Sequence, residues 1–551
     1  MRLLRSLPIA ACLWTAAICA AQDPLPQSRP PDQPRGTGVI RGRVTRADGR
    51  ALPRVFLRLS GTQQRLTRFG TTDEAGRFEF KDLPADSFML SAEKKGYVDL
   101  EYGQIRPFED GRPIRLAEGE TLEKVDIKLP RTSAIMGRVT DENDEPIQWA
   151  GVEVWRVEFF AGRRRLMPVS GETTLPTNDL GRYRSYGLPP GQYLLSARAS
   201  GYAPTYFPGT LNLAEALLVP VGWSQDVPNI DFSLIRTRTV HVSGMALDAS
   251  GQPLQGRIQL SPSNPAGIST VEPLFTASVQ RDATFDFANV APGDYLLQAI
   301  GNRPNQSPAG DRPEGEFASR YLSVGGKGVG GFTVQTSKGS TVSGRIVIDG
   351  DVSGLRYQDV TLVASSIDFD RSPMTLGLLA STRPRADWTF ELVGLTGLRV
   401  LRFLTAPIGW SIKAIHLNGV DITDTPVTFG TKDQSLTDVE IVVTNRAAEV
   451  SGSVTDERGR PITDYAVIVF STDQERWSRE SRFLKYTRPS QDGSFVVRGL
   501  PPAAYFVAAV DWVQGNEWQD PTFLQPLTAR ATRISLSDGQ KASVSPKLIA
   551  R

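Results

Sequence analysis

The chain has 551 residues, of which 40% are hydrophobic and 22% are charged, a composition that is ordinary for globular proteins. A chain of this length is too long for one hydrophobic core and suggests roughly four or five domains. Its 50 Gly and 39 Pro indicate many turns and favour an all-β fold over long helices. The 62 basic and 60 acidic residues nearly cancel, which argues against a nucleic-acid partner.

Residues 1–21 have the pattern of a cleaved secretory signal. Two arginines precede a mainly apolar run, and small residues end at Ala21, near which we expect cleavage. The segment is too short to span a membrane, and no later segment is long and apolar enough to do so. We therefore expect a secreted, periplasmic or cell-surface protein. A lipid anchor at Cys19 is the less favoured alternative.

The only two cysteines, Cys12 and Cys19, both lie in the signal segment. The exported chain then has no disulfide, so its stability must come from packed cores. Residues 22–37 are rich in proline and polar residues and are expected to form an extended or flexible leader.

A sequence motif then occurs five times. It consists of a strand with a central glycine, here called the glycine strand, followed by a polar turn. The glycines lie in "IRGRVT", "IMGRVT", "VSGMAL", "VSGRIV" and "VSGSVT", at Gly42, Gly137, Gly244, Gly344 and Gly452. The intervals of 95 to 108 residues suit a small β-sandwich that closes its own core.

A second recurring pattern follows each glycine strand. Two short strands flank a loop such as "GLPPG", with aromatic residues at fixed positions. Because period-two alternation places these rings on one face, we expect them in the sandwich cores. The first register holds Phe78, Tyr183, Phe285, Phe390 and Phe495; the second holds Phe88, Tyr193, Tyr295, Val400 and Tyr505.

An alternating strand closes each unit, and the next unit begins a few residues later. Such short linkers predict a semi-rigid string of modules with no room for a separate catalytic domain. The predicted modules are module 1 (38–131), module 2 (132–236), module 3 (237–338), a divergent module 4 (339–446) and module 5 (447–551).

The combination of glycine strand, Gly-x-Pro turn, G-x-F/Y and G-L-P-P-G-x-Y resembles the carboxypeptidase regulatory-like domain. This resemblance implies transthyretin-like, seven-stranded β-sandwiches of the carbohydrate-binding-like fold. Module 4 departs from the pattern, with "IDGDVSG" in its turn and Leu395-Thr396-Gly397 in place of the Leu-Pro-Pro-Gly loop. Such modules occur as appendages to enzymes, transporters and surface proteins, so the resemblance is specific for fold rather than for function.

The sequence offers little for catalysis. His241 and His416 are the only histidines, and neither precedes the glutamate of an H-x-x-E zinc motif, so we expect no metal, no cofactor and no enzymatic activity. We expect both histidines in or beside strands. The acidic run 141–145 is interpreted as a hairpin turn rather than a calcium site. The carboxylates Asp73, Asp179, Asp282 and Asp492 are interpreted as turn caps.

Binding is the remaining function, with carbohydrate as the leading ligand by resemblance. Exposed aromatic rings suit a saccharide because a planar ring covers the apolar face of a sugar. The alternatives are a structural, protein-interacting rod of the cell envelope, or an accessory subunit of a peptidase or polysaccharide-uptake system. The candidate ligand-contact aromatics break the core pattern: Tyr202, Tyr206, Phe207, Trp410, Trp477 and Trp518.

Overall fold

A computed structural model covers most of the chain after the predicted leader. The predicted signal peptide and residues 22–35 lie outside the described part. Within the described part, no helix is long and apolar enough to cross a membrane. The described residues are 36–62, 66–106, 108–160, 163–169, 173–236, 239–263, 269–270, 275–302, 315–352, 354–373, 380–430, 434–456 and 458–550.

The recurring glycine and the recurring aromatic residue lie directly opposite each other in every module. A methyl group built on Gly137 would lie 1.9 Å from the Ile230 carbonyl oxygen and 3.0 Å from the Tyr183 ring. The aromatic ring and the closing strand therefore occupy the space that a side chain would need. The paired residues are Gly42 and Phe78, Gly137 and Tyr183, Gly244 and Phe285, Gly344 and Phe390, and Gly452 and Phe495.

Modules 1 to 3 each pack two sheets face to face over a hydrophobic core. Module 1 contains β4 (Arg77–Leu83), β1 (Gly38–Arg46), β8 (Thr121–Leu122) and β9 (Ile127–Leu129), facing β3 (Thr67–Thr71), β2 (Phe56–Gly61), β5 (Asp86–Glu93), β6 (Leu100–Glu101) and β7 (Ile114–Leu116). Module 2 contains β13 (Thr173–Thr174), β14 (Arg182–Leu188), β10 (Ser133–Thr140), β18 (Asp226–Val227) and β19 (Phe232–Ser233), facing β16 (Thr205–Tyr206), β15 (Gly191–Arg198), β11 (Gly151–Phe160), β12 (Arg163–Pro168) and β17 (Val219–Val221), with η1 (Leu213–Glu215) beside them. Module 3 contains β24 (Thr284–Val290), β20 (Val240–Leu247) and β27 (Val329–Gln335), facing β23 (Phe275–Ser278), β21 (Gly256–Pro262), β25 (Gly293–Gly301) and β26 (Phe317–Val324); its β22 (Ser269–Thr270) pairs with β12 of module 2.

Modules 4 and 5 repeat the arrangement, so the divergent module 4 keeps the two-sheet fold. Module 4 contains β31 (Thr389–Leu395), β28 (Ser340–Asp349), β36 (Ser435–Thr444), β33 (Ser411–Leu417) and β34 (Val420–Asp421), facing β30 (Ser381–Thr382), β29 (Thr361–Ser366), β32 (Gly397–Thr405) and β35 (Val427–Phe429), with η2 (Tyr357–Asp359) and η3 (Phe369–Arg371). Module 5 contains β38 (Pro461–Ile462), β37 (Ala448–Thr455), β41 (Ser494–Leu500) and β44 (Lys541–Val544), facing β40 (Leu484–Thr487), β39 (Ala466–Ser471), β42 (Ala503–Val510), β43 (Thr532–Leu536) and β45 (Leu548–Ile549), with η4 (Gln474–Arg476), η5 (Gly515–Gln519) and α1 (Pro521–Leu527).

The predicted core residues are buried. All ten positions of the two aromatic registers are less than 10% exposed. The second register also anchors the preceding loop, because Tyr505 donates its hydroxyl hydrogen to the Pro501 carbonyl oxygen at 2.6 Å, and Tyr295 donates to Ala291 at 2.9 Å. The sequence prediction of an all-β chain of five sandwich modules is confirmed.

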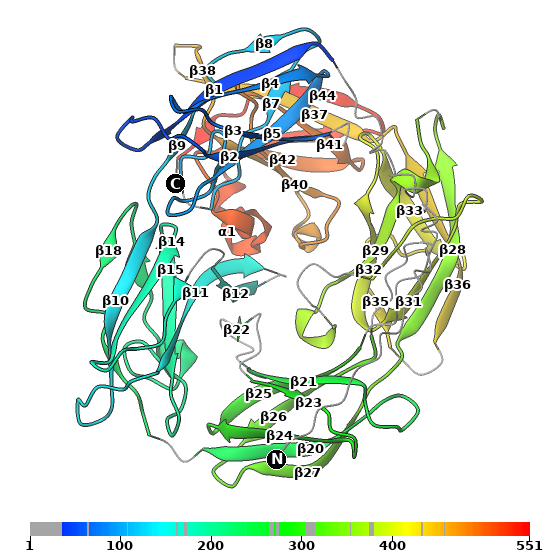
Figure 1. Cartoon of the computed structure of the whole chain (residues 1–551). Helices are drawn as coiled ribbons and strands as arrows, with labels where there is room; N and C mark the ends of the chain where they lie inside the picture. The colour runs from blue at the N-terminus through cyan, green and yellow to red at the C-terminus, as the bar shows by residue number, and fades with distance from the viewer. Residues whose placement is uncertain are drawn as a thin grey trace, which may run out of the picture.

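The five modules form a closed ring and not the string that short linkers predicted. Figure 1 shows module 1 (blue) beside module 5 (orange and red), with modules 2, 3 and 4 completing the circle. The predicted semi-rigid string of modules therefore does not stay open, because its two ends meet. The cause is that the first and last modules have surfaces that fit each other, a property that linker length does not reveal.

Charged side chains hold the first and last modules together. Arg488 of module 5 contacts Glu109 of module 1 at 2.9 Å, and both side chains are almost fully buried. Arg488 also contacts Asp464 at 2.8 Å, and Arg106 of module 1 reaches the same carboxylate at 2.9 Å. Burial raises the pKa of Glu109, while Arg488 opposes that rise. The deeply buried ion pair of Arg488 and Glu109 therefore connects module 5 to module 1.

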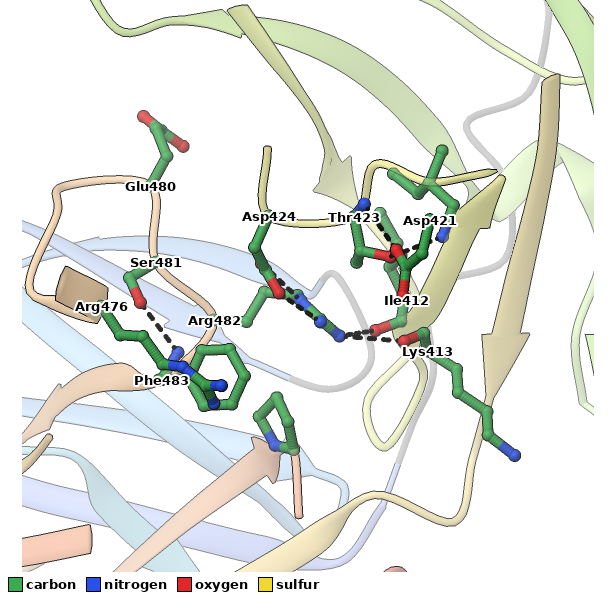
Figure 2. A network of polar contacts seen from close by, with 12 residues as sticks. Ile412, Lys413, Asp421, Thr423, Asp424, Arg476, Glu480, Ser481, Arg482 and Phe483 are labelled. Carbon is green, nitrogen blue, oxygen red and sulfur yellow. Dashed lines mark hydrogen bonds and ion pairs between the residues drawn. The ribbon is translucent and has the colours of Figure 1, made fainter. Parts of the chain in front are cut away.

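A second charged network joins modules 4 and 5 (Figure 2). Arg482 contacts Asp424 through two nitrogens, at 2.9 and 2.6 Å, and donates to the Ile412 carbonyl oxygen at 2.9 Å. Across the ring, Arg165 of module 2 lies 3.3 Å from Asp370 of module 4. The modules are thus held both by neighbouring contacts and by contacts through the middle of the ring.

Candidate ligand-binding cleft

The six aromatic residues predicted to contact a ligand lie against the module cores. Tyr206 is 6% and Trp477 is 4% exposed, so the prediction that these two rings are exposed is wrong. Tyr206 packs in a small cluster with Leu166, and its burial raises the pKa of its hydroxyl to about 12. The indole nitrogen of Trp477 donates to the Ser471 carbonyl oxygen at 2.7 Å. Both rings are buried and present no free face to a ligand.

The remaining four rings are partly buried. Tyr202, Phe207 and Trp410 pack against the cores of their own modules. Trp518 stacks on Tyr486 at 5.6 Å over the second apolar cluster of module 5, which α1 covers. None of the six lines the cavities described below, and a ligand contact by these four rings stays a prediction.

A cleft of about 660 Å³ lies between modules 1 and 2. It is within the size range of small-molecule sites. The module 1 side consists of residues 93–100 with Gln104 and Phe108, and the module 2 side includes Arg156, the end of β12, the end of β14 and the turn after β17. This inter-module cleft is lined by four aromatic rings: Tyr97, Phe108, Tyr186 and Trp223.

Two of these rings are open to solvent. Trp223 is 38% and Tyr186 is 39% exposed. Trp223 lies in the turn after β17, where the Gly222 backbone nitrogen donates to the Gln225 side chain at 2.6 Å and fixes the chain direction. Tyr186 lies on β14, with the Arg184 guanidinium 5.5 Å from the centre of its ring. These two rings therefore have the exposure that the predicted candidates were expected to have.

An arginine stacked on a phenylalanine lies at the inner end of the cleft. The Arg156 guanidinium carbon is 3.4 Å from the centre of the Phe108 ring. Phe108 also fits closely against Gly191, where an added methyl group would lie 2.8 Å from the ring. Burial lowers the pKa of Arg156 to about 10, so the side chain stays protonated at neutral pH. Its Nε is buried and has no hydrogen-bond partner among the described residues, and another nitrogen of the guanidinium forms an ion pair with Glu158.

The polar groups of the cleft carry both charges. Lys94 donates to the Pro53 carbonyl oxygen at 2.9 Å, and Lys95 lies next to it in the chain. Asp99 is opposite in charge, and its pKa is raised first by burial and then by the nearby Glu93. A site with mixed charge and aromatic walls suits a polar ligand with apolar faces.

The two histidines considered for chemistry lie in strands of modules 3 and 4. His241 lies on β20 beside Asp286 at 3.0 Å, and His416 lies on β33, so both are in strands as predicted. Within the described ranges, no group of three or more His, Cys, Asp or Glu side chains is placed to hold a metal ion.

The predicted turn caps are largely confirmed. Asp73, Asp282 and Asp492 accept backbone hydrogen bonds within their own turns. In the fourth turn the cap is Asn178 and not Asp179, because Asn178 accepts from the backbone nitrogens of Leu180 and Arg182. Asp141 accepts from the backbone nitrogens of Asn143 and Glu145, as in the other hairpin turns.

The cleft itself was missed by sequence reasoning. It exists only because two modules pack together, and neither repeat contains it alone. The signal that could have indicated it is Trp223 in "VPVGWSQ", because module 1 has "IRLAEGE", without a tryptophan, at the equivalent position.

Residues 39–130 and 134–221 match the model of the carboxypeptidase regulatory-like domain. The first two modules are therefore carboxypeptidase regulatory-like domains, as the motifs predicted. No curated protein matches the chain in sequence.

Three solved structures are examples of proteins that are similar to this chain. A streptococcal ancillary pilin is 15% identical, covering 55% of this chain and 98% of its own, with a TM-score of 0.18. The minor pilin GBS52 of Streptococcus agalactiae is 15% identical, covering 37% of this chain and 97% of its own, with a TM-score of 0.22. The shaft pilin of Lactobacillus rhamnosus GG is 12% identical, covering 37% of this chain and 98% of its own, with a TM-score of 0.20.

Proposed function

We propose that this chain is an exported, non-enzymatic binding protein that holds a saccharide in the cleft between modules 1 and 2. The observation that carries the proposal is the pair of solvent-open rings, Trp223 and Tyr186, in one inter-module cleft. Such rings bind the apolar face of a sugar, and Arg156 adds a charged polar group to the lining of the same cleft.

Export is proposed from the sequence of residues 1–21, and it fits a mature chain that depends on packed cores. Removal of Arg2 and Arg5 would leave 60 basic residues against 60 acidic ones. A mature chain of balanced charge has little long-range attraction for charged polymers in general. Selectivity then depends on local contacts in the cleft.

A glycan array probed with residues 22–551 tests this function. Binding by the unmodified chain that Trp223→Ala reduces at least tenfold supports the proposal. The matched control is Trp149→Ala, because Trp149 is 73% exposed on the same module and does not line the cleft. A blank array from a folded sample, or equal losses in the two variants, would contradict saccharide binding in the cleft.

A protein-binding scaffold is the second candidate. It is favoured by exposed apolar side chains on module 2, where Trp149 is 73% and Leu175 is 66% exposed. The Trp149 backbone nitrogen donates to the Thr177 carbonyl oxygen, which places the two segments side by side. Crosslinking in the native envelope would support this function if Trp149→Ala removed a specific protein partner that Trp223→Ala retained.

A further inference from the structure

Three cavities adjoin one another where modules 1, 2 and 5 meet. The inter-module cleft shares Gln104, Phe108 and Arg156 with a second cavity of about 500 Å³, here called the junction pocket, which modules 1, 2 and 5 build together. The junction pocket shares Gln192 and Gln514 with a third cavity of about 510 Å³, here called the rim pocket. Shared lining residues therefore place the three cavities in series, and this series is here called the path.

Module 5 supplies the far end of this path. The rim pocket lies between modules 2 and 5 and includes Trp512 and Pro220. Gly515 of module 5 donates its backbone hydrogen to the Phe108 carbonyl oxygen at 2.8 Å, which ties the segment containing Gln514 to module 1. The path is therefore complete only when the ring is closed.

The charge of the path changes along its length. The cleft has lysines and carboxylates, whereas the junction pocket is lined by six carboxylates and two arginines. Among these carboxylates, Asp110 has a pKa raised first by burial and then by Glu101. A polyanionic chain would meet like charge in the junction pocket, and a neutral or amino-bearing chain would not.

We propose that the saccharide is an extended, neutral or amino-bearing chain of several units, bound along the path from Trp223 past Phe108 to Trp512. This inference rests on the proposed function. Each cavity alone has the volume of a small-molecule site, so three in series exceed what one or two sugar units would fill. Module 5 contributes binding residues, and closure of the ring completes the site.

Calorimetry of residues 22–551 with oligosaccharides of two and six units tests the inference. The probes are chitin oligomers, their deacetylated amino forms and anionic oligogalacturonates. We expect the six-unit chitin or amino oligomer to bind at least tenfold more tightly than its two-unit form. Trp512→Ala should weaken only the six-unit oligomer, whereas Trp223→Ala should weaken both lengths.

Controls separate this inference from the proposed function. Trp149→Ala should leave all affinities unchanged, and Gln514→Ala serves as a second rim variant if Trp512→Ala does not fold. Equal affinity for both lengths, no effect of either rim variant, or tighter binding of oligogalacturonates would overturn the extended-chain proposal alone. No binding of any series would also overturn it, whereas the proposed function fails only on the glycan-array outcomes given above, a blank array or equal losses in Trp223→Ala and Trp149→Ala.

Discussion

Five glycine residues show how a missing side chain can shape a module. At Gly452, an added methyl group would lie 1.9 Å from the Val544 carbonyl oxygen and 3.0 Å from the Phe495 ring. No positive φ is involved at this position, so the requirement is steric. In all five modules an added methyl group would lie 2.6 Å or less from a backbone carbonyl oxygen, which explains why the glycine recurs.

Gly137→Ala should destabilise the protein by roughly 1–3 kcal/mol, because the new methyl group overpacks the module 2 core against Ile230. The matched control is Gly151→Ala in the same module, where no atom lies within 4 Å of the added methyl group. Chemical unfolding followed by circular dichroism measures the difference. Equal free energies of unfolding for the two variants would show that the close approach at Gly137 does not affect stability.

At the scale of elements, the hairpin turns depend on ionised aspartates. Asp456 accepts from the backbone nitrogens of Arg458 and Arg460, and Asp248 does the same in its own turn. Backbone hydrogen bonds lower the pKa of Asp456 and Asp141 below the ordinary value of 3.8 because they stabilise the charged form. The pKa values of Asp248 and Asp282 are lowered first by the hydroxyl groups of Ser250 and Thr284, and then by backbone hydrogen bonds.

We expect stability to fall as pH decreases through the ordinary carboxyl range. Above pH 3.8 these carboxyl groups are ionised in both the folded and the unfolded chain, so their full contribution to the free energy of unfolding is present. Below pH 3.8 the carboxyl groups of the unfolded chain take up protons first, so the folded state loses stability. The variant with Asp141, Asp248, Asp282 and Asp456 each changed to Asn should show a weaker decrease of the thermal midpoint between about pH 5 and pH 3. A decrease identical to that of the unmodified chain would refute the role of these turns.

The secondary-structure elements were largely predictable because the sequence pattern that specifies them lies within each repeat. Period-two alternation, Gly and Pro turns and the fixed aromatic register place both sheets of a module, and Phe78 and Tyr505 are buried as that register predicts. α1 was not predicted, since seven residues that include two prolines give little helical signal. The burial of Trp477 was not predicted either, because the second apolar cluster of module 5 has no counterpart in the repeat pattern.

At the scale of the whole molecule, ring closure was not predictable from the repeats. It depends on contacts between residues almost 380 positions apart, such as Arg112 donating to the Ser490 carbonyl oxygen at 2.9 Å. The candidate cleft has the same origin, since Phe108 and Arg156 come from different modules. Pattern reasoning within a module cannot locate a site that exists only between modules.

Arg488→Met should weaken ring closure by about 3–5 kcal/mol, because it leaves the buried Glu109 carboxylate with only the longer, 3.5 Å contact to Arg106. Small-angle X-ray scattering should then show a larger maximum dimension than for the unmodified chain. The matched control is Arg345→Met, whose partner Glu440 forms an exposed pair worth about 1 kcal/mol or less. Indistinguishable scattering from both variants would mean that the Arg488 pair does not hold the ring.

The measurement that tests the account most directly is a crosslink between modules 1 and 5. The predicted mature chain has no cysteine, so cysteines placed at Arg115 and Gln491 would be the only thiols. These residues exchange hydrogen bonds of 2.8 and 2.6 Å in the closed ring. We predict rapid intramolecular crosslinking by a short bismaleimide at low protein concentration. An uncrosslinked chain, or crosslinked dimers only, would show that the ends do not meet, and would contradict the closed ring and the three-module site built on it.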